Sequence, residues 1–247
     1  MTFDDLIKSF KVQPTLNRDI WDENNQLHPK IRWALIRVAK SFYEGIDLEN
    51  KPPIKDIVFT GSLANYNWSK FSDIDVHLLF DFKQYGEHQE TFENLFLLAK
   101  SNWNNKHDVT VKGFEVEIYA EDEDNPHTST GVYSILRNEW IKSPEKTTPV
   151  FDPLDVKSKA HYFIKLYRHI VQNVGSESVD VLLNRVEVLK DKIKRFRQAG
   201  LNKGGEYSTE NLAFKALRRG GVLDKLYTLG VELADQQLSV SEINTMR

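Results

Sequence analysis

The chain has 247 residues, of which 40% are hydrophobic and 28% are charged, and its net charge is −3. This length suits one large domain or two modest ones, and the apolar content is enough to bury a core. The sequence contains no cysteine, which excludes disulfide scaffolds and cysteine-based zinc sites, and its seven histidines show no paired metal-ligand spacing. No apolar run approaches the roughly 20 residues that cross a bilayer, and the N-terminus lacks the basic-then-apolar pattern of a secretion signal. We therefore expect a cytoplasmic protein with no membrane partner.

The charges are unevenly distributed along the chain. Residues 1–150 carry 17 basic and 24 acidic side chains, giving −7, whereas residues 151–247 carry 16 and 12, giving +4. An acidic half followed by a basic half suits a protein that holds metal in one part and a polyanion in the other. We accordingly divide the chain into a first domain, 1–150, and a second domain, 151–247.

The sequence of the first domain predicts a mixture of helices and strands. Apolar residues recur at three- and four-residue steps, which predicts a helix over 29–45. The pair Pro52-Pro53 then breaks the chain before an apolar strand at 56–60. The further elements expected here are a strand at 73–82, a helix marked by the apolar stripe from Phe92 to Trp103, and a strand at 109–120.

The sequence from residue 121 onward predicts a connector followed by helices. The acidic run 121–124 is typical of a solvated turn, and we expect 121–150 to link the two domains. Beyond it the sequence shows helical rather than strand-like periodicity. The helices expected are one marked by Ala160 to Val174, one marked by Leu182 to Phe196 and broken at Gly200 and at Gly204-Gly205, and shorter ones at 208–219 and 221–238.

Two basic clusters occur in this helical part. The first comprises the positions away from the apolar stripe of the second helix, namely Lys190, Lys192, Lys194, Arg195 and Arg197. The second comprises Lys215, Arg218 and Arg219, beside Gly220-Gly221. Such faces are usually just solvated, and the alternative is contact with nucleic acid, nucleotide phosphates or an acceptor.

The most informative pattern is an acidic-apolar-acidic triplet in the second predicted strand. Side chains alternate faces along a strand, so Asp73 and Asp75 point the same way while Ile74 and Val76 point into the protein. Two ionised carboxylates this close repel each other and need a cation between them. Mg²⁺ fits because it uses one or two carboxylates together with substrate phosphates. The pattern therefore indicates phosphoryl or nucleotidyl transfer.

This region resembles the DNA polymerase beta-like nucleotidyltransferase superfamily. The sequence signature of this superfamily consists of an apolar strand, a Gly-Ser turn, a spacer, an acidic-apolar-acidic triplet and a later third acid. The matching residues are Ile57-Val58-Phe59-Thr60, Gly61-Ser62 and Asp73-Ile74-Asp75. The third acid is Glu115 or Glu117, and Glu117 is favoured because it lies in an apolar-acid-apolar-apolar context. Glutamate at this point departs from the commoner aspartate of the family.

The resemblance implies a fold and a set of roles. The fold is α+β, with a small mixed β-sheet core backed by helices and followed by a helical C-terminal domain. Asp73, Asp75 and Glu117 would be both the catalytic residues and the ligands of Mg²⁺, with Mn²⁺ as the alternative ion. The residues expected to bind the nucleotide triphosphate are Gly61, Ser62, Lys70 and Ser72. Glycine permits close approach of a phosphate to the main chain, and serine offers it a hydroxyl and an amide.

The expected function is Mg²⁺-dependent transfer of a nucleoside monophosphate from an NTP to an acceptor hydroxyl, with release of pyrophosphate. The basic second half favours an RNA end as the acceptor. The alternatives are a transferase that modifies a protein or a small molecule, and a non-catalytic nucleotide-binding module on the same scaffold. Phosphate-binding Gly-x-x-x-x-Gly-Lys-Ser/Thr and Gly-x-Gly-x-x-Gly patterns are absent from the sequence.

Overall fold

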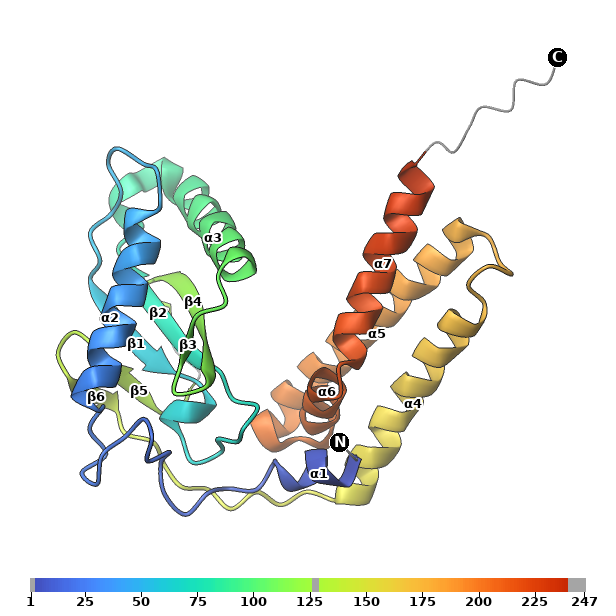
Figure 1. Ribbon diagram of the computed structural model, residues 1–247, viewed down its shortest axis with the longest axis horizontal. Helices are drawn as coiled ribbons and strands as arrows, with labels where there is room; N and C mark the ends of the chain where they lie inside the picture. Colours follow the sequence, from blue (N-terminus) through green and yellow to red (C-terminus); the bar gives the residue numbers. More distant parts are fainter. Residues whose placement is uncertain (1–2, 126–128, 240–247) are drawn as a thin grey trace. The chain divides into compact units, whose positions relative to one another are not determined.

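The structure is a computed structural model that describes residues 3–125 and 129–239 (Figure 1). It divides into two compact units, one spanning residues 12–148 and the other combining the N-terminal segment to Lys11 with the chain from Pro149 onward. The sequence-based boundary at 150 thus lies close to the observed one, but the segment before Val12 belongs to the second unit rather than the first. Within the described residues, no helix combines the length and apolarity needed to cross a membrane.

The unit of residues 12–148 contains a six-stranded mixed sheet. Its helical elements are α2 (Pro29–Glu44), η1 (Ser62–Ala64), η2 (Lys83–His88) and α3 (Gln89–Lys106). Its strands are β1 (Asp56–Thr60), β2 (Ile74–Phe80), β3 (Thr110–Val111), β4 (Phe114–Asp122), β5 (Val132–Ser134) and β6 (Glu139–Lys142). The strand order is β3-β4-β2-β1-β5-β6, in which β2 and β4 are parallel and the other pairs are antiparallel. The predicted mixed sheet backed by helices and followed by a helical region is confirmed.

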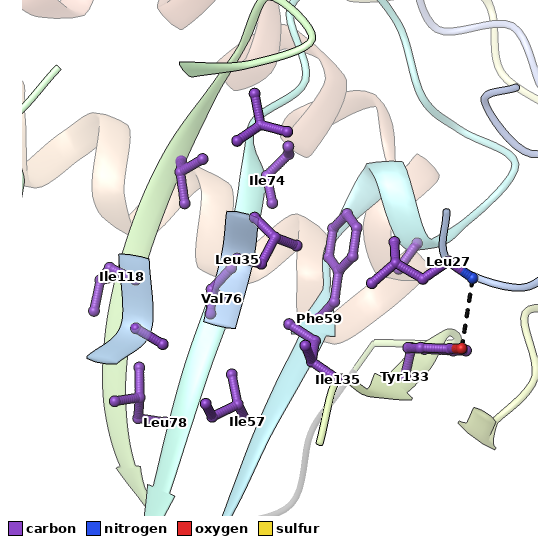
Figure 2. Packing of buried hydrophobic residues seen from close by; sticks show 14 of the residues in the cluster. Leu27, Leu35, Ile57, Phe59, Ile74, Val76, Leu78, Ile118, Tyr133 and Ile135 are labelled. Atoms are coloured by element: carbon purple, nitrogen blue, oxygen red, sulfur yellow. Dashed lines mark hydrogen bonds between the residues drawn. The ribbon is translucent and has the colours of Figure 1, made fainter. Parts of the chain in front are cut away.

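One face of the sheet forms the core. Ile74, Val76 and Leu78 of β2 are fully buried, and they belong to one apolar cluster with Leu35 of α2 (Figure 2). Phe96 of α3 is part of the same cluster. Since strand side chains alternate, the odd-numbered residues of β2 point to the opposite face. The helices therefore cover one face, whereas the other face carries Asp75 and His77 together with a small buried cluster of Val58, Leu79 and Val132.

A buried tryptophan fixes the turn that follows β1. Trp21 is fully buried, and its indole N–H donates a hydrogen bond to the carbonyl of Leu63, at 2.7 Å. Its ring stacks on Phe59 and on Trp140, with centroids 5.4 Å and 4.6 Å away. A rigid aromatic ring that also satisfies a buried carbonyl holds η1 in one position, because breaking that bond would leave the carbonyl unsatisfied.

The expected strand at 109–120 is in fact a hairpin. Lys112 and Gly113 both have positive φ values, 56° and 82°, and they form the tight turn between β3 and β4. The connector expected at 121–150 is also wrong in part, because β4 continues to Asp122 and β5 and β6 follow as a second hairpin. Residues 126–128 of that connector lie outside the described residues.

The acidic run at the end of β4 includes a buried structural residue. Asp122 is only 5% exposed, and its carboxylate accepts hydrogen bonds from the backbone N–H groups of Phe82 and Asp124, at 3.1 Å and 3.0 Å. Buried carboxylates need such partners. Asp122 therefore ties the end of β4 to the segment after β2, instead of lying in a solvated turn.

The second unit is helical throughout its described residues. Its elements are α1 (Phe3–Lys8), α4 (Pro153–Gln172), α5 (Val179–Gly204), η3 (Gly205–Tyr207), α6 (Thr209–Arg219) and α7 (Val222–Leu238). Asp152 caps α4 by accepting a hydrogen bond from the N–H of Leu154, and Ser208 caps α6 in the same way from Asn211. Phe10, just after α1, is 4% exposed and belongs to the core of this unit. Its ring lies 4.8 Å from the guanidinium of Arg219, which also donates to the hydroxyl of Ser9 at 2.6 Å.

The second long helix of this unit is not broken at Gly200, contrary to the sequence prediction. A Cβ built there would lie 2.4 Å from Cβ of Glu210 and 2.7 Å from the hydroxyl of Ser208. The glycine therefore allows the start of α6 to pack directly against α5. Helix α5 continues to Gly204, so the prediction of a break at Gly204-Gly205 is correct to within a residue.

Candidate metal centre

Three acidic side chains meet at one end of the polar sheet face. In the strand register Asp75 lies between Thr60 of β1 and Glu117 of β4, and Asp73 directly precedes β2. Asp73, Asp75 and Glu117 each offer a carboxylate oxygen, and these oxygens all lie within 4.8 Å of one another. All three residues are half-buried. The structure therefore brings together the three acids that the sequence singled out.

The donor set fits a hard divalent cation. Two oxygens bound to one Mg²⁺ are at most about 4.2 Å apart, since each lies about 2.1 Å from the ion. Neighbouring oxygens around the ion are only about 3.0 Å apart, so the three oxygens, which lie within 4.8 Å of one another, must draw together by side-chain rotation when an ion binds. Carboxylate oxygens without nitrogen or sulfur ligands are the chemistry that Mg²⁺ and Mn²⁺ prefer.

The geometry distinguishes the two sequence candidates for the third acid. Glu117 is paired with Asp75 in the register of β2 and β4. Glu115 points to the same face two residues earlier, but it is exposed, pairs with Thr110 of β3 and lies outside the acidic group. Glu117 is therefore the acid placed to share a cation with Asp75.

Gly61 lies directly against one of these carboxylates. Its φ of 76° and ψ of −166° belong to a region that is essentially restricted to glycine. A Cβ at this position would lie 1.8 Å from Oδ2 of Asp75. The bare main chain of the turn and the carboxylate of β2 are thus in contact, so any other residue at position 61 would push Asp75 out of the acidic group.

The loop between the turn and β2 is held by serine hydroxyls. The hydroxyl of Ser62 donates to that of Ser72, at 2.7 Å, and Ser72 in turn accepts from the N–H of Ser69, at 3.0 Å. Ser72 is buried, so its hydroxyl has a role in fixing the loop just before Asp73. Lys70 is exposed on the same loop, with its ammonium 5.1 Å from the ring centroid of Phe71. The expected contacts of these residues with a triphosphate stay predictions.

Asn65 holds the other side of the turn. It is 6% exposed, and its amide donates to the carbonyl of Gly61 at 2.7 Å and to the hydroxyl of Ser129 at 3.2 Å. Its side-chain carbonyl accepts from the hydroxyl of Thr130. With all these bonds made, Asn65 shapes the Gly-Ser turn, and it does so by bonding to a segment 64 residues further along the chain.

A tyrosine that sequence analysis missed contacts the acidic group. The hydroxyl of Tyr119 donates to Oε2 of Glu117, and its ring stacks on His77 with centroids 4.5 Å apart. The imidazole lies between the hydroxyl of Thr60, 3.1 Å from Nε2, and the carboxylate of Glu121, 3.0 Å from Nδ1. Alternation along β4 places residues 117, 119 and 121 on one face, and the register of β4 on β2 makes it the face of residues 75 and 77.

The phenol of Tyr119 also responds to the local negative charge. Burial raises its pKa well above the ordinary value, and the hydrogen bond to Glu117 and the charges of Asp75, Glu117 and Asp73 raise it further. Three carboxylates on one half-buried patch create an environment that disfavours another anion and attracts a cation. The geometry and the electrostatics of this group are therefore both of the kind that suits a cation.

Comparison with known proteins adds no family assignment. No protein-family model matches the sequence, and no curated protein is significantly similar to it.

Proposed function

We propose that this protein is a Mg²⁺-dependent nucleotidyltransferase of the DNA polymerase beta-like type. The observation that carries the proposal is the meeting of Asp73, Asp75 and Glu117 within 4.8 Å of one another, with Gly61 in contact with Asp75. A solvated acidic patch does not require a glycine-only turn beneath one of its carboxylates. A site for a metal-bound triphosphate does, because the phosphates must approach the main chain.

The residues divide into two tasks. Asp73, Asp75 and Glu117 would hold the cations, and bound cations would supply neutralisation of phosphate charge and easier deprotonation of an attacking hydroxyl. Gly61 and Ser62 hold the triphosphate through the turn. The acceptor oxygen bonds to the α-phosphorus, the bond to the β-phosphate oxygen breaks and pyrophosphate leaves, while the acceptor proton passes to a carboxylate or to water. The protein contributes positioning and charge, with no covalent enzyme intermediate.

The proposal is tested by incubating the full chain with an α-labelled NTP, Mg²⁺ or Mn²⁺ and an RNA oligonucleotide. We expect label on the RNA and release of pyrophosphate. Asp75→Asn should reduce the rate by at least about 10²-fold, since the stabilisation that metal ions give the transition state amounts to several kcal/mol. Glu115→Gln is the matched control, because it removes a carboxylate from the same strand face without touching the acidic group, and it should keep the rate.

Three outcomes would change the proposal. Label transferred to protein or to a small hydroxyl compound, but never to RNA, would identify the alternative class of acceptor. Binding of NTP with Mg²⁺ but no pyrophosphate with any acceptor would identify a non-catalytic nucleotide-binding module. Equal effects of the Asp75 and Glu115 substitutions would refute the assignment of the site.

A further inference from the structure

The helical unit carries a group of cations on two adjacent helices. We call Arg197 of α5 together with Lys215 and Arg218 of α6 the α5–α6 cation cluster. Arg197 and Arg218 are exposed, and the side chain of Lys215 between them is 23% exposed. This arrangement differs from an ordinary solvated face because one ammonium lies largely inside the protein surface.

Arg197 is held in a fixed position before any ligand binds. Its guanidinium lies 4.4 Å from the ring centroid of Phe214, and its Nε donates to Oδ1 of Asn211 at 3.3 Å. Asn211 is only 1% exposed and donates in turn to the carbonyl of Glu206, at 2.7 Å. A stacked guanidinium on a buried support loses little entropy when it binds a phosphate.

The cluster brings several positive charges close together. Glu206 is the carboxylate in contact with Lys215, at a loose 3.7 Å. Burial lowers the pKa of Lys215; the charge of Glu206 opposes this shift, whereas the charges of Arg219, Arg218 and Arg197 add to it. Although Arg197 is exposed as a whole, partial burial of its guanidinium lowers its pKa, and the charge of Arg218 lowers it further. Several cations that repel one another on a partly buried surface are stabilised by an anion that binds among them.

Aromatic rings and further lysines border the cluster. Arg197 and Phe214 line a cavity of about 290 Å³ between α5, α6 and α7, together with Lys190, Lys194 and Tyr227. Lys190, Lys194 and Arg197 follow one another at helical spacing on α5, and Lys190 lies 5.0 Å from the ring centroid of Tyr227. Glu187 and Asp191 also line the cavity, and Glu187 is paired with Lys190 at 2.8 Å. Cations interleaved with aromatic rings are typical of surfaces that bind single strands.

We propose that the α5–α6 cation cluster binds the phosphate groups of a single-stranded nucleic acid, with Phe214 and Tyr227 beside it as surfaces for bases. Together with Lys190 and Lys194, the cluster extends over two helices and along two turns of α5. This extent suits successive phosphates of a strand better than one compact triphosphate. The inference rests on the proposed function in one respect only, which is that the bound strand is identified as the acceptor of the transferred nucleotide. Binding itself requires neither metal nor catalysis.

The test measures binding of a fluorescently labelled 12-nucleotide RNA to the full chain in EDTA, over a range of salt concentrations. The test variant is Arg197→Gln/Arg218→Gln. The matched control is Lys165→Gln/Arg168→Gln, which removes two exposed cations from α4 of the same unit. Each lost phosphate contact makes the negative slope of log K against log salt shallower by about 0.7 for a single strand. We expect a slope reduced by about 1.4 and an affinity reduced roughly 25-fold at 0.1 M salt, with the control unchanged.

A second variant protects the test against misfolding. Arg218 is exposed, so Arg218→Gln should fold like the wild type and lower the slope by about 0.7. Equal RNA binding by the wild type and both cluster variants would overturn the proposal. It would also be overturned if the cluster variants lost binding of inorganic triphosphate but still bound RNA as the wild type does. Because EDTA removes metal, a protein that binds RNA through the cluster but transfers no nucleotide would refute the proposed function and leave this inference intact.

Discussion

Substitution of Gly61 by alanine is the sharpest test of the metal centre. The added Cβ would lie 1.8 Å from Oδ2 of Asp75, whereas real Cβ contacts essentially never fall below 3.0 Å, so the carboxylate must move by more than an ångström. A metal ligand has to lie within about 0.2 Å of its proper distance. A displacement of this size should therefore remove Asp75 from the ion.

The expected magnitudes follow from the backbone and the displacement. The φ of 76° with ψ of −166° is a conformation that costs a residue with a side chain about 1–3 kcal/mol, so the free energy of unfolding should fall by that amount. A misplacement of about 1 Å in a catalytic arrangement lowers rates by about 10²-fold. We expect Gly61→Ala to lose Mn²⁺ affinity and nucleotidyl transfer together while it still folds.

Gly113→Ala provides the control for backbone strain. Gly113 has a φ of 82°, but a Cβ there would meet no heavy atom within 4 Å. This variant should lose stability without losing the site. The measurements are Mn²⁺ titration, pyrophosphate release and urea unfolding on both variants. A Gly61→Ala protein that binds Mn²⁺ as tightly as the wild type would refute the reasoning.

Two further substitutions test contacts around the sheet and within the helical unit. Tyr119→Phe keeps the stacked ring but removes the hydrogen bond to the third acid, so Mn²⁺ affinity should fall about 10-fold; an unchanged titration would mean that the phenol serves packing alone. The hydrogen bond and ion pair between Lys159 and Glu210, at 2.8 Å, lower the pKa of that carboxyl. Its stabilising effect is therefore present above the ordinary pKa of about 4.3 and is lost as pH falls through the lowered value. Glu210→Gln should cost about 0.5–1 kcal/mol at pH 7, and its urea midpoint should approach that of the wild type as pH falls through the lowered pKa; a difference that does not shrink as the solution is acidified would contradict the linkage.

Elements with strong periodicity were predictable from the sequence. Helix α2 was expected at 29–45 and spans Pro29–Glu44, and β1 was expected at 56–60 and spans those residues. The acidic triplet was also informative, because alternation alone places Asp73 and Asp75 opposite Ile74 and Val76. A local pattern that burial enforces on every second or fourth residue can be read without knowing what packs against it.

Features that depend on distant contacts were not predictable. Strands β5 and β6 are short, and β5 is buried on both faces, so neither shows a period of two. Gly200 looked like a helix breaker because its neighbours on α6 are invisible in the local sequence. The choice of Glu117 over Glu115 needed the register of β4 on β2, and the bond from Tyr119 needed the same information.

The contact of Phe10 and Ser9 with Arg219 has a consequence for how the chain is made. The partners are 210 residues apart, so at about 5–20 residues per second a ribosome needs roughly 10–40 s to deliver the second after the first. During that time the whole sheet unit emerges and is free to fold, whereas the leading segment waits without its docking surface. Ser9 and Phe10 are thus among the last of these residues to reach their final place.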